Sequence, residues 1–256
     1  MAERAPLYDT IGRTYATSRR ADPRIAARIR AALGDAKSLV NVGAGTGDYE
    51  PRDLDVVAVE PSPVMIAQRP PGSARAVQGT AEALPLADDS VDVAMAINSD
   101  HHWPDRAAGL REMRRVARRR VVLLNSDPDA ALDFWLTRDY LTGFLDLIPE
   151  PYRVPGSWRA ELRELLGDVR LQDVGVPHDC VDGFYQAYWR RPRQYLSAEI
   201  RDNISVFRRL PRADVDAAVA HLRRDLDGGT WQARNVDLLD RDVLDVGLRL
   251  IVADVS

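Results

Sequence analysis

Residues 38–49 form a short apolar run that leads directly into a glycine-rich turn, and no other stretch restricts the fold of the chain as strongly. Glycines at alternate positions of this turn permit positive φ angles and let a ligand approach the backbone closely. A second apolar run at 56–60 ends in Glu60, whose carboxylate can accept hydrogen bonds from two ribose hydroxyls. The order strand, glycine turn, strand and acid therefore predicts a nucleotide-like cofactor at the carboxyl ends of a parallel sheet.

The spacing of the glycines distinguishes between cofactors. The turn has Gly43-x-Gly45-x-Gly47, whereas the dinucleotide fingerprint G-x-G-x-x-G would need a glycine at position 48, which is Asp48 here. A Tyr-x-x-x-Lys proton donor is not recognisable in the chain either. An NAD(P)-dependent oxidoreductase stays an alternative, but the shorter glycine pattern favours a different nucleotide-like cofactor.

The order of apolar segments predicts an α/β fold with a doubly wound, mostly parallel sheet. Helices are expected at 22–33 and, with solvated arginines, at 105–119. Only eight residues, Pro51 among them, separate Gly47 from the next strand, so a very short helix or a turn is expected there. The strands are expected at residues 39–42, 56–60, 74–78, 91–96, 121–124, 169–176 and 248–253, the last of them antiparallel.

These motifs resemble the class I S-adenosylmethionine-dependent methyltransferases, in particular their small-molecule, UbiE-like group. The resemblance begins at the glycine turn, continues through Glu60-Pro61-Ser62 and the sequence QGTAEALPL at 78–86, and includes 90–96 as the fourth strand. It covers roughly residues 8–127 and fades in the half that faces the substrate in this family. It implies a Rossmann-like, doubly wound, seven-stranded sheet whose last strand is antiparallel.

The resemblance also implies that S-adenosylmethionine is the cofactor and S-adenosylhomocysteine the product. The family places an apolar side chain, here Met65, under the adenine and an Ala-Glu pair at the adenine edge. In relatives the amino-terminal segment folds across the cofactor, with an aromatic lid and a cation that faces the methionine carboxylate; the alternative is a surface helix whose tyrosines pack on the core. The cofactor-binding residues predicted in this way are Tyr15, Arg19, Gly43, Ala44, Gly45, Gly47, Glu60, Pro61, Met65, Thr80, Ala81, Glu82, Asn98 and Ser99.

The loop after the fourth strand carries the predicted catalytic group. Methyl transfer from a sulfonium is an in-line displacement, so the protein has to align the acceptor and, for a hydroxyl acceptor, remove its proton. A neutral histidine suits that second task. Related O-methyltransferases pair a histidine at this place with an aspartate that ends strand five, which makes His101 with Asp127 the candidate dyad and His102 an alternative base. The other interpretation is that the His-His-Trp sequence only shapes the loop.

The chain is expected to divide at residue 127. Residues 1–127 would hold the cofactor-binding core with an amino-terminal lid helix, and residues 128–256 the rest of the sheet with an inserted helical cap at about 181–240. About seventy residues lie between the last two expected strands, far more than a hairpin needs. Helices that fill this gap are expected near 181–191, 195–209 and 212–227.

Aromatic residues in this second half suggest where an acceptor binds. Aromatic walls suit a ring-bearing acceptor, although an aromatic stripe on a helix more often belongs to a core. The candidate acceptor-binding residues are Trp135, His178, Tyr185 and Tyr188.

Composition excludes several other classes of protein. A net charge of −4 gives no general electrostatic reason to bind nucleic acid, and no apolar run approaches the ~20 residues of a membrane span. The single cysteine, Cys180, cannot form an intrachain disulfide and is expected to be buried, and the amino terminus lacks the apolar core of a signal peptide. Four histidines without clustered carboxylates predict no metal site. A cytoplasmic enzyme, monomeric or homodimeric, fits these features.

The sequence therefore predicts an enzyme that transfers a methyl group from S-adenosylmethionine to an oxygen, nitrogen or carbon nucleophile of a small molecule. The arginine-rich and alanine-rich composition suggests a high-GC bacterial genome, in which enzymes of this kind often modify secondary metabolites. A protein that binds S-adenosylmethionine without transferring the methyl group would have the same first half and stays an alternative.

Overall fold

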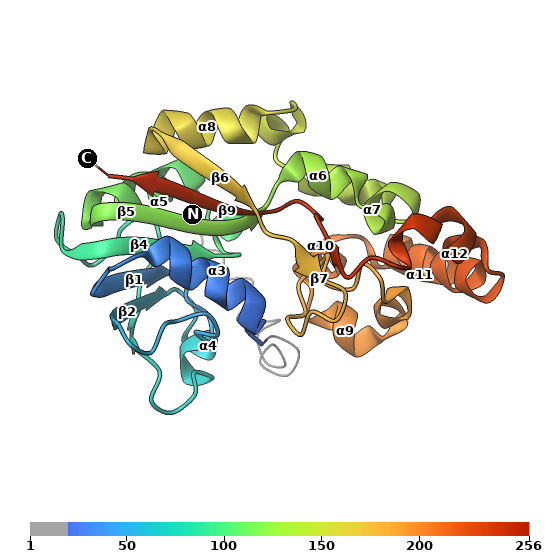
Figure 1. Ribbon diagram of the computed structural model, residues 1–256, viewed down its shortest axis with the longest axis horizontal. Helices are drawn as coiled ribbons and strands as arrows, with labels where there is room; N and C mark the ends of the chain where they lie inside the picture. The colour runs from blue at the N-terminus through green and yellow to red at the C-terminus, as the bar shows by residue number, and fades with distance from the viewer. Residues whose placement is uncertain (1–19, 256) are drawn as a thin grey trace.

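The computed structural model describes residues 20–255 (Figure 1). The strands are β1 (Ser38–Val42), β2 (Asp55–Glu60), β3 (Arg75–Gln78), β4 (Val91–Ile97), β5 (Ala117–Ser126), β6 (Val169–Asp173), β7 (Val176–Pro177), β8 (Val243–Leu244) and β9 (Leu248–Asp254). The α-helices are α3 (Pro23–Leu33), α4 (Pro63–Ala67), α5 (Arg106–Val116), α6 (Pro128–Asp133), α7 (Trp135–Asp139), α8 (Ser157–Leu166), α9 (Ala198–Asp202), α10 (Ser205–Arg209), α11 (Arg212–Asp227) and α12 (Thr230–Arg234). Short 3₁₀ helices are η2 (Asp100–His102), η3 (Thr142–Leu147), η4 (Glu150–Arg153), η5 (Pro192–Leu196) and η6 (Val236–Leu238).

Seven strands form one sheet in the order β3-β2-β1-β4-β5-β9-β6. β1, β2, β3, β4 and β5 pair in parallel, whereas β9 lies antiparallel between β5 and β6. The predicted doubly wound sheet with an antiparallel last strand is therefore confirmed. The chain reverses between β1 and β4, and such a switch point is where open α/β sheets bind ligands.

Helices cover both faces of the sheet (Figure 1). α3 packs on one face through Ile25 and Ile29, and α5 and α8 pack on the other through Leu110 and Leu162. Alternate residues of the strands point to the two faces, and those in the central strands are almost fully buried. The result is two apolar layers separated by the sheet.

Two local predictions are confirmed, one for the helix before β1 and one for the segment after the glycine turn. α3 begins after Asp22, whose side chain caps the helix, and ends at Gly34, which has a φ of 65°. No helix follows the glycine turn, because the chain passes through turns from Val42 to Asp55. A buried ion pair between Arg69 and Glu50 braces this connection, and Arg69 Nη1 also donates to the carbonyl of Gly45 at 3.1 Å.

The helix predicted at 105–119 is shorter than expected. α5 ends at Val116, and Ala117 already takes an extended conformation and pairs with Val91 of β4. Arg118, Arg119 and Arg120 therefore belong to β5, where pairing with β4 and β9 overrides the helical pattern. The prediction that all the arginines of this segment are solvated is also wrong, because Arg106 is buried.

The carboxyl-terminal half differs more from the prediction. The expected strand at 169–176 divides into β6 and β7, and the expected helix at 195–209 divides into η5, α9 and α10. The helix expected at 181–191 is absent, because this segment forms turns that are held by long-range bonds such as Trp189 Nε1 to the carbonyl of Val176 at 3.0 Å. α11 matches the helix predicted at 212–227.

We call α6, α7, α9, α10, α11 and α12 the cap helices; they gather beyond the carboxyl end of β5 (Figure 1). An aromatic cluster holds them together. Trp135 contacts Trp231 edge to face with ring centroids 5.2 Å apart, and Trp135 Nε1 donates to the carbonyl of Trp189 at 2.9 Å. The apolar core is continuous from α3 through the sheet to this cluster.

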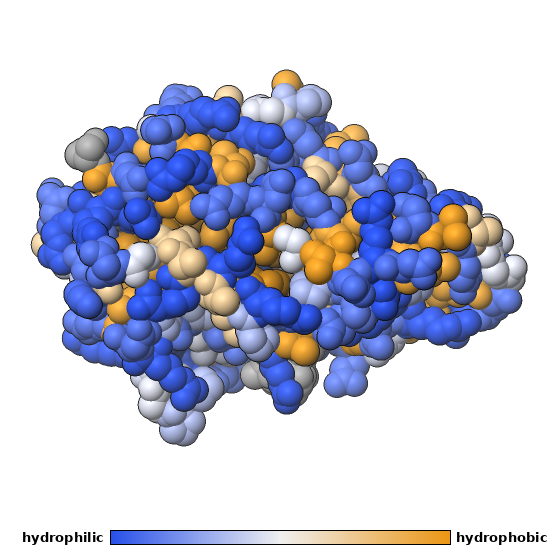
Figure 2. All heavy atoms as spheres, viewed as in Figure 1, coloured by the Kyte–Doolittle hydropathy of each residue, from blue (hydrophilic) through white to orange (hydrophobic). Residues whose placement is uncertain are grey.

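Hydrophilic residues dominate the face of the molecule in Figure 2, and the apolar residues on it lie in separate groups. Among the helices that the structure describes, none has the length and apolar character needed to cross a bilayer.

Candidate cofactor and acceptor site

The glycine turn lies against the end of β4. Gly43, Gly45 and Gly47 all have positive φ, at 67°, 52° and 84°. A Cβ at Gly43 would lie 2.6 Å from Cβ of Ser99, which is closer than two carbon atoms can approach. Ser99 Oγ in turn donates to the carbonyl of Val42 at 2.8 Å. Glycine is therefore required here by both backbone conformation and space.

Glu60 holds the glycine turn in place through hydrogen bonds to its backbone. Its carboxylate is 5% exposed and accepts hydrogen bonds from the backbone N–H groups of Gly45, at 2.8 Å, and of Ser62, at 2.9 Å. Buried Met65 lies next to Gly45, since a Cβ on that glycine would be 3.4 Å from the Met65 Cε. A carboxylate, free backbone space and an apolar side chain thus meet at the carboxyl end of β2.

The remaining predicted cofactor residues surround this place. Ala44 is buried in the turn, Pro61 follows Glu60, and Ala81 is buried beside α5. Glu82 accepts a hydrogen bond from the backbone of Asp105 at 3.2 Å, and Thr80 is exposed. The two lid residues predicted, Tyr15 and Arg19, lie outside the described residues.

Asn98 connects the glycine turn to a second feature, a large cavity. It follows β4 directly and has a φ of 51°, an unusual value for a residue other than glycine. Its Nδ2 is buried and has no hydrogen-bond partner. Asn98 also lines a cavity of about 520 Å³ between the carboxyl ends of the strands and the cap helices.

His101 and His102 lie in η2 and both line this cavity. Their ring centroids are 3.9 Å apart, and His101 is the more exposed of the two. The predicted pairing of His101 with Asp127 is not found among the described contacts. Asp127 is 1% exposed, caps α6 by accepting from the N–H of Asp129, and forms an ion pair with Arg159. Its carboxylate therefore stabilises the start of α6.

A buried charged network that was not predicted from the sequence lies next to the histidines. Asp100 is fully buried and accepts from Arg106 Nε at 2.9 Å and from Asn125 Nδ2 at 2.5 Å. Arg106 also forms an ion pair with Glu161 of α8, whose carboxylate accepts from the hydroxyl of Tyr152 at 2.7 Å. Burial alone would lower the pKa of the Arg106 guanidinium, but the neighbouring carboxylates and Tyr152 raise it. Burial and the bond to Glu161 raise the pKa of Tyr152 to about 12.

One local signal could have drawn attention to Arg106. It is the first residue of α5, where the positive end of the helix dipole disfavours a cation. An arginine at that position needs compensating carboxylates, which Asp100 and Glu161 supply.

The far wall of the cavity is apolar and comes from the variable half of the chain. The residues that form it include Phe144, Leu147, Ile148, Phe184, Tyr185, Ile204 and Val206. Tyr185 is the one predicted acceptor residue in the described lining, and its hydroxyl bonds Thr137 at 2.9 Å. Trp135 and Tyr188 instead pack in the aromatic cluster, and His178 lies beside Asp242 at the β7–β8 ribbon.

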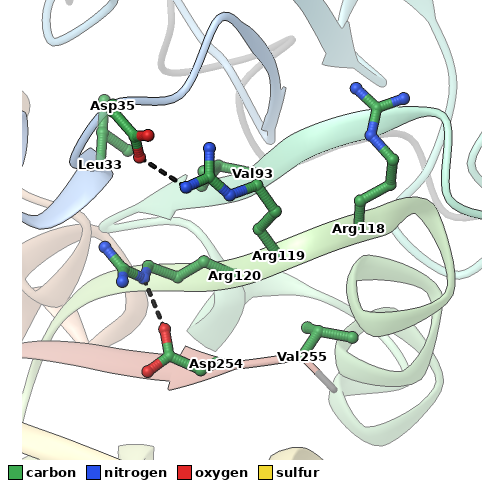
Figure 3. Close-up of a pocket in the computed structure, with 8 residues that line it drawn as sticks. All are labelled: Leu33, Asp35, Val93, Arg118, Arg119, Arg120, Asp254 and Val255. Carbon is green, nitrogen blue, oxygen red and sulfur yellow. Dashed lines mark hydrogen bonds and ion pairs between the residues drawn. The ribbon is translucent and has the colours of Figure 1, made fainter.

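A second cavity, of about 350 Å³, lies at the opposite, amino end of the strands (Figure 3). Three consecutive arginines of β5 line it, but each pairs with an aspartate: Arg118 with Asp92, Arg119 with Asp35 and Arg120 with Asp254. Its charge is thereby compensated, and it is distant from the glycine turn. Within residues 20–255, no group of three or more histidine, cysteine, aspartate or glutamate side chains is arranged to hold a metal ion.

Comparison with known proteins agrees with this geometry. A family model described as a methyltransferase domain matches residues 40–124. Uncharacterized methyltransferases of Mycobacterium bovis and Mycobacterium tuberculosis are 36% identical to the chain over 141 residues, which is 52% of this chain and 47% of each relative. The matched region thus spans about half the length of these curated relatives.

Solved structures extend the similarity to the cap helices. A protein of Anabaena variabilis, described as a methyltransferase from an antibiotic biosynthesis pathway, is 33% identical with a TM-score of 0.80, covering 92% of this chain and 98% of its own. The [4+2]-cyclase SpnF has a TM-score of 0.55 at 15% identity, with 98% and 94% coverage, and so shares the fold alone. Given one-third identity to a methyltransferase over nearly the whole of both chains, together with the glycine turn and Glu60, the chain belongs to the class I S-adenosylmethionine-dependent methyltransferases.

Proposed function

We propose that this chain binds S-adenosylmethionine at the glycine turn and transfers its methyl group to a small molecule in the 520 Å³ cavity. One observation carries the proposal: two adjacent residues, Asn98 and Ser99, join the two places. Ser99 touches the position of Gly43, and Asn98 lines the cavity. A donor and an acceptor bound on either side of this dipeptide would be neighbours, as an in-line displacement requires.

The residues at the turn fit the cofactor of the family. The backbone at Gly43 and Gly45 leaves room that a side chain would fill, Met65 offers an apolar surface, and the Glu60 carboxylate suits hydroxyl donors. When bound, S-adenosylmethionine supplies an electrophilic methyl group on a sulfonium. The protein then has to align the acceptor, exclude water and accept any proton that the acceptor releases.

The chain offers two groups for that proton, His101 and His102. Both imidazoles line the cavity, and Asp100 immediately before them is fixed by the bonds to Arg106 and Asn125. We assign the base role to one of these histidines for a hydroxyl acceptor. The size of the cavity and its apolar cap wall fit a single small molecule. The similarity to the Anabaena variabilis protein, described as part of an antibiotic biosynthesis pathway, supports the same class of acceptor.

The first experiment is calorimetric titration with S-adenosylhomocysteine, with NADH as the parallel control. Micromolar binding of S-adenosylhomocysteine alone is expected, while tight binding of NADH would favour an oxidoreductase. A screen of small hydroxyl, amine and carbon acceptors with labelled S-adenosylmethionine then tests transfer. Binding without transfer to any acceptor would favour a protein that binds S-adenosylmethionine but does not transfer its methyl group.

Once an acceptor is known, His101→Gln and His102→Gln test the base. The variant that removes the base should lower kcat by about 10² to 10⁴ and abolish the fall in kcat at acid pH. The other variant should keep the shape of the pH profile. Normal pH profiles in both variants would show that the histidines only shape the loop.

A further inference from the structure

Arg106 lines the acceptor cavity, and one of its donors is buried without a partner. Its Nε bonds Asp100 and its Nη1 pairs with Glu161, but its Nη2 is buried without a hydrogen-bond partner. The side chain is 8% exposed, so bulk water does not solvate it. A buried donor of a charged group without a partner is costly, and such groups call for a specific explanation.

Asn98, another residue of the same lining, has a second buried donor without a partner. Its Nδ2 is buried without a partner, and its backbone keeps the left-handed conformation at the end of β4. Strained residues with unpaired polar atoms cluster at ligand sites, where the ligand completes the bonding. Both orphan donors thus belong to residues that face a single space large enough for a small molecule.

The charge of the lining restricts what this molecule can be. The described residues around the cavity include three carboxylates, of Asp100, Asp105 and Glu161, and two guanidinium groups, of Arg106 and Arg209. A carboxylate or phosphate bound at Arg106 would therefore lie beside Asp100 and Glu161 and would be repelled by them. An ammonium group would leave both orphan donors unpaired, since it can only donate hydrogen bonds.

We propose that the acceptor is a neutral, largely apolar molecule whose carbonyl or hydroxyl oxygens accept from Arg106 Nη2 and Asn98 Nδ2 once these two side chains turn toward the cavity. Its apolar part packs against Phe144, Ile148 and Tyr185. This inference rests on the proposed function, because it names the class of acceptor that the same cavity takes. The oxygen atoms accept the two unused donor hydrogens without adding charge. The rings of Phe144 and Tyr185 stack with centroids 5.4 Å apart and belong to the apolar part of the cavity lining.

Three naphthalene probes of the same shape test the proposal without knowledge of the natural acceptor. They are 2-acetylnaphthalene, which is neutral, 2-naphthoate, which is anionic, and 2-naphthylmethylammonium, which is cationic. Their affinities are measured by calorimetry with the full chain, in the presence and absence of saturating S-adenosylhomocysteine. The ketone should bind at least tenfold more tightly than either ion. Equal or tighter binding of an ion, or no saturable binding of the ketone, would overturn the proposal.

Two variants identify the donors. Arg106→Lys keeps the positive charge between Asp100 and Glu161 but removes the planar set of donors, and should weaken ketone binding about tenfold. Asn98→Asp keeps shape and tolerance of positive φ but exchanges a donor for an acceptor, so ketone binding should weaken and ammonium binding should strengthen. Arg111→Lys, on the exposed side of α5, is the matched control and should leave all three affinities unchanged.

Far-UV circular dichroism and the thermal transition establish that each variant is folded, because Asn98 is itself a predicted cofactor-binding residue and a change in cofactor affinity would not report folding alone. If Arg106→Lys fails to fold, the proposal is tested by Asn98→Asp alone, through its weaker binding of the ketone and stronger binding of the ammonium probe. Unchanged probe affinities in the folded variants would contradict the role of these donors. Failure of S-adenosylhomocysteine to bind, with the probe preference intact, would instead count against the proposed methyl transfer and leave the cavity preference standing.

Discussion

Glu60 is the residue on which the predicted cofactor site depends most. Its buried carboxylate accepts two backbone N–H groups, one in the glycine turn and one before α4, in addition to its expected bonds to ribose hydroxyls. Because a carboxylate only accepts, it can serve several donors at once, whereas an amide presents two hydrogens of its own. The sequence predicted the position and the ligand of Glu60, and the structure adds that it also shapes the turn.

Glu60→Gln should therefore weaken S-adenosylhomocysteine binding by tenfold or more. The amide nitrogen of the glutamine would face either a backbone N–H or a ribose hydroxyl hydrogen, and a lost charge-assisted bond is worth about 1.5–3 kcal/mol. Titration calorimetry measures the change. Glu164→Gln, which removes an exposed carboxylate from α8, is the control. Equal affinities of the two variants would show that Glu60 acts only on the turn or not at all.

The glycine turn allows a matched test at the scale of an element. Gly43 and Gly72 both have positive φ, but a Cβ at Gly43 would overlap Ser99, while a Cβ at Gly72 would meet no atom within 4 Å. Gly72→Ala should cost about 1 kcal/mol from backbone strain alone. Gly43→Ala should cost more, on the order of 2–4 kcal/mol, and also abolish cofactor binding. Urea unfolding measures the loss of stability in each variant, and calorimetry measures cofactor binding. An equal loss of stability in both variants would mean that Ser99 moves away from the new Cβ at little cost.

α3 carries a pH-dependent cap. Asp22 is fully buried, and its bond to Arg24 lowers its pKa from 3.8 to about 2. Stability from this carboxylate is complete above pH 4, where it is ionised in both folded and unfolded chains, and is lost as the pH falls from about 4 to 2. Asp22→Asn, which retains a capping side chain, should therefore lower the free energy of unfolding by about 1–2 kcal/mol at pH 7 and by about half of that near pH 3.

Urea unfolding at pH 7, 5 and 3 measures this difference. The matched control is Asp35→Asn, because Asp35 is an exposed partner of Arg119 and surface pairs contribute little. A deficit in Asp22→Asn that stays constant across these pH values would contradict a contribution from the charge.

The elements that could be predicted from sequence are those with local signals. α3 has its cap at Asp22, Pro23 in its first turn and Gly34 at its end, and the strands of the parallel sheet are continuous apolar runs. The segment at 181–191 carries aromatic residues at helical spacing, but bonds to distant partners hold it in turns. Local periodicity cannot reveal those partners.

The same reason explains the errors in the candidate site. Arg106 was expected to be solvated, and its partner Glu161 lies 55 positions away in the sequence. Asp127 was paired with His101 by resemblance to related O-methyltransferases, and its described partner, Arg159, lies 32 positions away on α8. The glycine turn and Glu60 were predictable because strand, turn and acid follow one another closely along the chain. The cofactor half of the site is thus local in sequence, while the acceptor half is assembled from distant segments.

At the scale of the whole molecule, the continuous apolar core indicates that the sheet and the cap helices unfold together. The cluster that contains Ile25 of α3 also contains Trp135, Trp189 and Trp231 of the cap region. The chain has five tryptophans, and the other two, Trp103 and Trp158, lie near α5 and α8 on the opposite side of the sheet. A Trp103→Phe, Trp158→Phe double variant would therefore make tryptophan fluorescence a report on the cap alone.

In that double variant, the thermal transition followed by cap fluorescence should coincide with the transition of the whole chain followed by far-UV circular dichroism. Adding Trp135→Phe removes the bond to the carbonyl of Trp189 and one edge-to-face contact, a loss of about 2 kcal/mol that should lower Tm by about 4–8 °C in both signals. S-adenosylhomocysteine, although it binds at the glycine turn, should raise both transitions equally. A fluorescence transition below that of circular dichroism, unmoved by S-adenosylhomocysteine, would show instead that the cap unfolds independently of the sheet, and that its contacts with the core are too weak to hold the acceptor cavity in one shape.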